Sequence, residues 1–309
     1  MSQWLRRMAA VAALCIVAAC GGGDDGETRN VVQVAQGDPR FSILVEAVTA
    51  ADLATTLSSP GPFTVFAPTN DAFAALLVEL GVTKDQLLAN KPLLTAVLQY
   101  HVLSSSVSKA AVPLGQPITP LDGGIFKVDV VGSNLIVTDG RNRTSTIVAA
   151  DIAASNGVIH AIDKVLLPAD KNIVQTAAAN ASFSILVEAV TAANLAGTLS
   201  GPGPFTVFAP TDAAFAALLT ELGVTKAQLL ADTALLTRVL TYHVVPSSVL
   251  KAQVPVGKPI TTVEGGTFTV NGSLAITDER GRSANITATD VLASNGVIHV
   301  IDKVILPAP

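Results

Sequence analysis

The feature that most constrains this chain is an internal repeat that covers almost its whole length. Residues 41–48 recur as 183–190 and residues 63–69 recur as 205–211, both at an offset of 142. Across 41–127, about three quarters of the positions are identical in the second copy. A unit of about 140 residues has the size of one domain and is too long for a solenoid repeat. The sequence therefore predicts two tandem domains with the same fold.

The boundaries of the two predicted domains follow from the repeat. The second copy begins near Asn172, which matches Asn30, so the domains span 30–168 and 172–307. Residues 169–171 are the predicted linker. Because this linker is very short, we expect the domains to touch or to have limited relative freedom.

Hydrophobic periodicity predicts helices in the first part of each unit and strands in the second. In the first copy the predicted helices are 41–57, 69 or 70 to 80, 83–89 and 92–99. The predicted strands are 63–67, 125–131, 135–138, 144–150 and 158–166. Residues 130–134 form a predicted hairpin turn that is three residues shorter in the second copy, so the later offset is 139. Helices followed by strands favour an α+β fold.

The N-terminal residues predict that the protein is exported from the cytoplasm. Arg6 and Arg7 precede an apolar run, 8–17, that is too short to span a bilayer but fits a secretory signal. Residues 1–19 are therefore the predicted signal peptide. The run ends in Val-Ala-Ala-Cys, which resembles a bacterial lipobox and implies that Cys20 is acylated. An ordinary signal peptide followed by a stray cysteine is the alternative.

The segment after the predicted cleavage site is rich in glycine and aspartate. Residues 20–29 are therefore expected to be a lipidated cysteine followed by a flexible tether. Three acyl chains would hold the chain stably in a lipid bilayer, which is its first expected partner. We expect an exported, membrane-anchored lipoprotein at the outer membrane and cell surface, or facing the periplasm.

Composition excludes several classes of protein. The chain has 309 residues, of which 19 are basic and 24 acidic, giving a net charge of −5. Nucleic-acid binding requires a basic surface, so we expect no nucleic-acid partner. Half of the residues are hydrophobic and 14% are charged, which excludes a disordered chain. The two cysteines, Cys15 and Cys20, precede the repeats, so the repeats hold no disulfide, cysteine-zinc cluster or catalytic cysteine.

No motif for catalysis stands out in the repeats. The Gly-x-Ser-x-Gly pattern of a nucleophile elbow is absent, and the Gly-Gly pairs lack the lysine of a phosphate loop. Asn70-Asp71 of the first copy becomes Asp212-Ala213 in the second, so the two domains cannot share a catalytic carboxylate at the second position. We expect a protein that is not an enzyme and that needs no cofactor or metal.

Each repeat contains two histidines, and they allow two interpretations. One is a metal site that joins His101 to His160 with a carboxylate such as Asp71. The other, which we favour, is that each histidine sits half-buried in a strand and satisfies a hydrogen bond, because two histidines without a close-spaced cluster are a poor ligand set. The corresponding residues of the second copy are His243 and His299.

Three ordered motifs suggest a family. Residues 63–73, Phe-Thr-Val-Phe-Ala-Pro-Thr-Asn-Asp-Ala-Phe, recur as 205–215, and the Asn-Gly-Val-Ile-His segment of 156–168 recurs within 295–307. A Tyr-His pair lies between these motifs in both copies. Each unit thereby resembles a fasciclin domain. The resemblance implies a β-wedge or sandwich of about seven strands flanked by short helices.

The resemblance also implies candidate sites. In animal fasciclin proteins the matching Tyr-His region is implicated in integrin binding, so Tyr100, His101, Tyr242 and His243 are candidate adhesion positions. The structural alternative is that each tyrosine is packed and each histidine hydrogen-bonded at a helix-to-strand junction.

The function expected from these observations is a lipid-anchored, non-catalytic adhesion or protein-interaction module of the cell envelope, bivalent through its two domains. Its partner would be a protein or polysaccharide ligand of unknown identity at the cell envelope. One alternative is a polysaccharide-binding protein that attaches to a matrix, although the single tryptophan, Trp4, lies in the predicted signal peptide. A hydrolase is the other alternative, and no nucleophile–base pair supports it.

Overall fold

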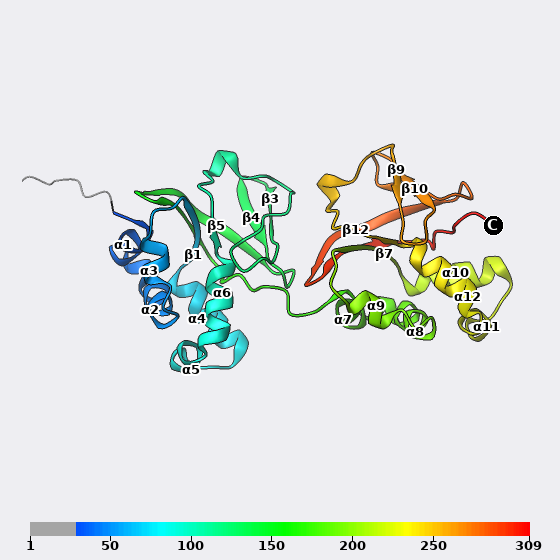
Figure 1. The fold of residues 1–309 in the computed structure, drawn as a ribbon, viewed down its shortest axis with the longest axis horizontal. Helices are drawn as coiled ribbons and strands as arrows, with labels where there is room; N and C mark the ends of the chain where they lie inside the picture. Colours follow the sequence, from blue (N-terminus) through cyan, green and yellow to red (C-terminus); the bar gives the residue numbers. More distant parts are fainter. Residues whose placement is uncertain (1–28) are drawn as a thin grey trace, which may run out of the picture.

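The computed structural model of the protein describes residues 29–309. The predicted signal peptide, Cys20 and all but the last residue of the predicted tether lie outside the described residues. Two domains follow one another along the longest axis of the molecule, each with strands on one side and helices on the other (Figure 1). Between residues 29 and 309, no helix is long and apolar enough to cross a membrane.

Each domain is built on one curled sheet. The first has six strands in the order β2 (Val102–Leu103), β1 (Phe63–Pro68), β6 (Gly157–Ile162), β5 (Thr144–Ala154), β4 (Asn134–Thr138), β3 (Lys127–Val131). The second has seven, in the order β8 (Val244–Val245), β7 (Phe205–Pro210), β13 (Gly296–Ile301), β12 (Ser283–Ala293), β11 (Ala275–Thr277), β10 (Thr267–Val270), β9 (Pro259–Thr261). Only β1 with β6, and β7 with β13, run parallel.

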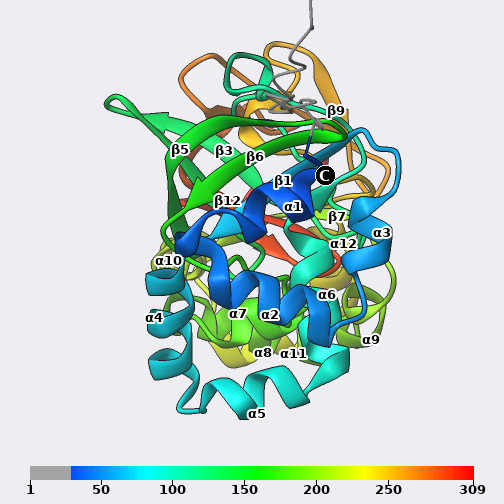
Figure 2. The same cartoon turned by 90° about the vertical axis from the view of Figure 1, so that its left-hand side faces the viewer.

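The helices of each domain gather on one side of its sheet (Figure 2). In domain 1 they are α1 (Val31–Gln36), α2 (Ser42–Ala50), α3 (Ala54–Ser58), α4 (Asn70–Leu80), α5 (Lys84–Ala89) and α6 (Lys91–Tyr100). Domain 2 repeats them as α7 (Ile173–Ala178), α8 (Ser184–Ala192), α9 (Ala196–Ser200), α10 (Asp212–Leu222), α11 (Lys226–Ala231) and α12 (Thr233–Tyr242). The predicted α+β fold is confirmed.

Local capping explains most helix boundaries. The Thr69 hydroxyl accepts a hydrogen bond from the Ala72 amide at the start of α4, and Gly81 ends that helix in the left-handed conformation. The helix predicted over 41–57 is instead two helices, α2 and α3. They are separated at Asp52, whose φ of 56° ends the first helix. The short helix α1 was not predicted, because its six residues are too few for a periodic signal.

The strand β1 is buried along its whole length because side chains pack on both faces of the sheet. Its alternating residues Val65 and Ala67 join the core beneath the helices. Phe66 points to the opposite face and joins a second core with Tyr100 and Phe126. The same two cores recur in domain 2.

The Asn-Gly pair before β6 fastens three segments together. The Asn156 side chain accepts a hydrogen bond from the Val31 amide at 2.9 Å and donates to the carbonyls of Leu57 and Ser59 at 2.8 Å. A Cβ atom on Gly157 would lie 2.1 Å from the carbonyl oxygen of Phe63, so only glycine fits there. The Asn-Gly motif therefore positions β6 against β1 and ties both to α1 and α3.

We expect Asn156→Ala to lower the free energy of unfolding of domain 1 by about 2–4 kcal/mol, because it leaves one amide and two carbonyl groups without partners. Urea unfolding of the full chain, with hydrogen-exchange mass spectrometry to assign each transition to its domain, measures the loss. Asn295→Ala is the matched variant, since Asn295 makes the same three hydrogen bonds in domain 2. A loss below about 0.5 kcal/mol in either domain would contradict this role.

Candidate functional site

The four candidate adhesion residues are buried in both domains. Each tyrosine is the last residue of a helix, α6 or α12, and each histidine caps that helix just before a short strand. The four side chains are at most 1% exposed. Side chains this buried cannot touch a partner in this conformation, and their role in adhesion stays a prediction. The alternative, a packed tyrosine beside a hydrogen-bonded histidine, is what the structure contains.

His101 joins the end of α6 to the segment that follows β6. Its Nδ1 lies 2.7 Å from the carbonyl oxygen of Val97, and its Nε2 accepts a hydrogen bond of 2.9 Å from the Leu166 amide. These partners assign the proton to Nδ1 and leave the ring neutral. His243 repeats the arrangement with Val239 and with the amide of Ile305, which lies beyond β13.

Burial favours the neutral form of both rings. It lowers the pKa of His101 to about 4 and lowers the pKa of His243 equally, to about 4. The hydrogen bonds to the helix carbonyls oppose this shift only in part. Neither histidine is therefore suited to donate or accept a proton in catalysis near neutral pH.

Tyr100 connects the same helix to the strand layer. Its hydroxyl donates a hydrogen bond of 2.6 Å to the carbonyl oxygen of Ile125, and its ring meets Phe126 edge-on at a centroid distance of 5.7 Å. Burial raises its pKa above the usual range. Tyr242 donates in the same way to Thr267, and its oxygen accepts from the Glu279 amide. The tyrosines thereby hold the loop that leads into β3 or β10.

The second histidine of each domain lies in a central strand. His160 has its Nε2 2.8 Å from the carbonyl of Val107, and its Nδ1 accepts from the amide of Asp151. Its ring nitrogens are thus bonded to backbone groups, as are those of His101. Within residues 29–309, no group of three His, Cys, Asp or Glu side chains is placed to hold a metal ion. The arrangement supports the hydrogen-bonded interpretation of these histidines.

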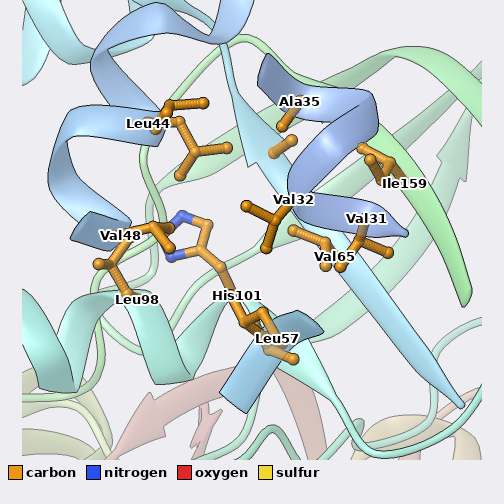
Figure 3. Close-up of a pocket in the computed structure, with 13 residues that line it drawn as sticks. Val31, Val32, Ala35, Leu44, Val48, Leu57, Val65, Leu98, His101 and Ile159 are labelled. Atoms are coloured by element: carbon orange, nitrogen blue, oxygen red, sulfur yellow. The ribbon is translucent and has the colours of Figure 1, made fainter. Parts of the chain in front are cut away.

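An apolar cavity of about 30 Å³ lies beside His101, between α1, α2, α3 and β1. Figure 3 shows the imidazole ring among aliphatic side chains such as Leu44, Val48 and Leu98. Domain 2 has a cavity of about 30 Å³ at the equivalent place, lined by Ile173, Leu186 and others. A space of this size holds little more than one or two water-sized groups, so it is too small for a sugar ring.

An exposed surface that sequence reasoning missed is repeated in both domains. The helices α2 and α8 have the same nine residues, Ser-Ile-Leu-Val-Glu-Ala-Val-Thr-Ala. On each, an exposed glutamate pairs with the first lysine of α5 or α11: Glu46 with Lys84 at 2.7 Å, and Glu188 with Lys226 at 2.8 Å. We call these two surfaces the helical faces. Identity at exposed positions was the signal that could have revealed them.

The two helical faces lie on the same side of the molecule (Figures 1 and 2). Both views place α2 and α8 below the sheets, with α5 and α11 beside them. Two copies of one surface therefore lie on the same side of the molecule.

We expect the stability of the folded chain to fall as the pH drops from about 6.5 to 4. In this window an unfolded histidine binds a proton, whereas His101 and His243, with a pKa of about 4, stay neutral in the folded chain. The unfolded state therefore binds more protons, and each histidine removes about 3 kcal/mol by pH 4. Urea unfolding between pH 7 and 4.5 measures the slope.

His101→Gln serves as the control for that slope, because glutamine does not titrate in this range. The variant should be less stable at pH 7 but should lose the histidine contribution to the pH dependence in domain 1 alone. Equal slopes for domain 1 of the variant and of the parent chain would contradict the assignment.

Comparison with known proteins agrees with this architecture. The profile of the fasciclin domain matches residues 39–168 and 181–307. Protein sll1483 of Synechocystis is 46% identical over 139 residues, which cover 45% of this chain and 73% of that protein. The transforming growth factor-beta-induced protein ig-h3 of Sus scrofa is 32% identical over 257 residues, 81% of this chain. This chain spans only 35% of that mammalian protein.

One solved structure is also similar to this chain, at low sequence identity. The FAS1 domain pair from the insect cell adhesion molecule fasciclin I is 18% identical, with a TM-score of 0.44, and covers 87% of this chain and 97% of that one. The two profile matches together span most of the described residues, and each includes the strand pair β1 and β6 or β7 and β13. The chain thus belongs to the fasciclin-domain family, with two tandem fasciclin domains.

Proposed function

We propose that this chain is a non-catalytic adhesion or interaction module of the cell envelope, anchored by lipid on Cys20 and bivalent through its two helical faces. The observation that carries the proposal is the repetition of one exposed surface on the same side of both domains. The family membership agrees with it, since the insect fasciclin I is named as a cell adhesion molecule.

A duplicated domain strengthens binding when both copies engage one partner. When one domain has bound, the second faces its site at an effective concentration on the order of millimolar, so avidity exceeds the affinity of one domain by about 10²–10⁴. The benefit requires that the two sites face the same way and stay within reach. The position of both helical faces on one side of the molecule supports the first condition, and the predicted three-residue linker supports the second.

The helical face has the chemistry of a surface contact. The side chains of Glu46 and Lys84 are 46% and 40% exposed, so their ion pair contributes little to stability and can exchange partners. Exposed Thr49 lies one helical turn beyond Glu46 on the same helix. A protein or polysaccharide with matching charges and hydroxyl groups would fit this mixed polar surface.

The lipid anchor is supported by the sequence that precedes the described residues. An acylated Cys20 followed by about ten tether residues would place domain 1 close to the membrane surface. The chain would then present both helical faces from the envelope while its folded domains remain in water. Nothing in the geometry of residues 29–309 supplies a nucleophile paired with a base, which favours binding over catalysis.

The first test of this function is attachment by the parent bacterium. We expect deletion of the gene to reduce cell–surface attachment and cell–cell aggregation. The full chain should restore both, whereas Cys20→Ala or removal of residues 172–307 should not. Unchanged attachment in the deleted strain would overturn the adhesion proposal. Full rescue by the one-domain chain would remove bivalency alone.

The second test addresses the helical faces. We expect Glu46→Lys or Glu188→Lys alone to leave one domain bound and to lower apparent affinity for the cell surface about 100-fold. The double variant should lose binding altogether. Glu79→Lys together with Glu221→Lys makes the same change of net charge at exposed, ion-paired glutamates of α4 and α10, outside the helical faces, and is the matched control. Equal losses in the control and the double variant would show that net charge, and not the faces, controls binding. Binding of the parent chain to members of a glycan panel would identify a polysaccharide as the ligand.

A further inference from the structure

The two domains meet through a buried ion pair. Lys127 of β3 lies 2.8 Å from the Asp290 carboxylate of β12 and 2.9 Å from Asp129 of its own strand. The side chains of Lys127 and Asp290 are 14% and 3% exposed. The second oxygen of Asp290 accepts a hydrogen bond from the Lys251 amide at 2.7 Å. A charge pair this enclosed depends on its geometry, because either partner alone would be buried without compensation.

A second contact is a pair of hydrogen bonds from one asparagine. The Asn142 side chain donates to the carbonyl of Leu292 at 3.0 Å and accepts from the amide of the same residue at 2.7 Å. Asn142 has a φ of 62°, a conformation that glycine adopts with least strain and asparagine tolerates. The turn itself does not require a side chain at this position, so the Asn142 side chain serves the contact with domain 2.

Apolar and close backbone contacts complete the joint. Ile125 of domain 1 packs against a small cluster formed by Leu250, Leu292 and Val297 of domain 2. A Cβ atom on Gly115 would lie 3.2 Å from the Cβ of Ala252, which brings the two domains into direct contact there. The joint therefore combines charge, paired hydrogen bonds and an apolar contact.

We define the joint by two faces, one from each domain. The β3 face of domain 1 is Ile125, Lys127, Asp129 and Asn142. The β12 face of domain 2 is Leu250, Asp290 and Leu292. Since the domains are copies, each domain has both kinds of face, but only one of the two lies in the joint. The other lies at the outer end of the molecule. Domain 2 has a β10 face at its outer end, and domain 1 has a β5 face at its own.

The β10 face lacks every side chain that makes the joint. Register confirms the equivalence, since Lys127 pairs with Thr138 across β3 and β4, and Thr269 pairs with Thr277 across β10 and β11. The residues at the four equivalent positions are Thr267, Thr269, Asn271 and Gly281. Thr269 stands where domain 1 has its lysine, and Gly281, with a φ of 70°, stands at the turn position of Asn142.

The β5 face keeps the carboxylate but loses the apolar contact. Asp151 has a φ of 59° and accepts a hydrogen bond of 2.7 Å from the Lys109 amide, as Asp290 does from Lys251. This aspartate is therefore part of the fold in both domains. The leucines of the β12 face are replaced in domain 1 by Ser108 and Ala153.

We propose that the joint is a specific lock between one β3 face and one β12 face, and that the residues at the two outer faces prevent the same lock from forming between chains. The joint is heterologous, because two different surfaces meet. A heterologous contact that repeats without closing a ring produces open filaments. Two nearly identical domains would carry this risk, and the substitutions at the outer ends remove it. The chain should therefore remain a closed pair with fixed helical faces.

The test transplants the joint residues to the outer faces of the full chain, purified in a mild detergent. One variant receives a β3 face at its outer end through Thr267→Ile, Thr269→Lys, Asn271→Asp and Gly281→Asn. The other receives a β12 face through Ser108→Leu and Ala153→Leu. Circular dichroism and melting confirm that each variant folds as the parent chain does.

Analytical ultracentrifugation then measures mass up to about 1 mM protein, the effective concentration that a short linker supplies. We expect the parent chain and each variant alone to remain monomeric. Their mixture should form a pair of twice the mass, and a chain with all six substitutions should form longer oligomers. A mixture that stays monomeric would overturn the proposal, and so would concentration-dependent oligomers of the parent chain.

A second measurement tests the lock from inside one chain. Lys127→Thr with Asn142→Gly gives domain 1 the residues that domain 2 carries at the same backbone positions, so its fold should be kept. We expect trypsin to cut after Lys171, in the linker, at least tenfold faster. Lys171 is already exposed, but its carbonyl is held by the Ser294 amide, and a linker between separated domains can leave that position and adopt the extended conformation that the protease cuts. Cleavage products are identified by mass, and an unchanged rate would overturn the proposal.

Discussion

The parallel pairing of two motif strands in each domain is the contact on which the remaining structure depends. The carbonyl of Phe63 occupies the space where a side chain on Gly157 would lie, and the neighbouring Asn156 bonds to segments before and after α2. The strand pair thereby fixes the helices on one side of the sheet and the aromatic core on the other. Both motifs of the family are recognisable in sequence because this contact tolerates few residues.

The burial of the Tyr-His pairs changes how substitutions there should be interpreted. His101 holds the end of α6 to the segment after β6, and Tyr100 holds the carbonyl of Ile125, whose side chain packs in the joint between domains. Replacing either residue would disturb a helix, a loop and the domain contact together. A loss of adhesion after such a change would therefore reflect altered positions of other surfaces, and would not by itself identify a contact residue.

Sequence reasoning predicted the elements whose signals are local. The cap at Thr69, the left-handed Gly81 and the Asn156-Gly157 turn each specify their own backbone, so α4 and β6 begin where expected. The break at Asp52 was missed because aspartate adopts a positive φ only occasionally, so its presence alone does not mark the end of a helix. The packed Tyr-His pair was one of the two interpretations that the sequence allowed. The position of the helical faces could not be predicted, since it depends on how distant segments pack.

The pattern of differences between the two copies separates folding from association. Residues that maintain the fold, such as Asp151 and Asp290, are the same in both domains and make the same hydrogen bond. Residues that only join the domains differ, and Lys127 has become Thr269 where no neighbour requires a charge. The exposed helix surfaces of α2 and α8 are identical, and only part of that identity serves the fold, since the serine that begins each helix bonds to the first residue of α4 or α10. The exposed ion pairs Glu46–Lys84 and Glu188–Lys226 contribute little to stability, so their repetition is what the proposed binding of one partner by both domains would use.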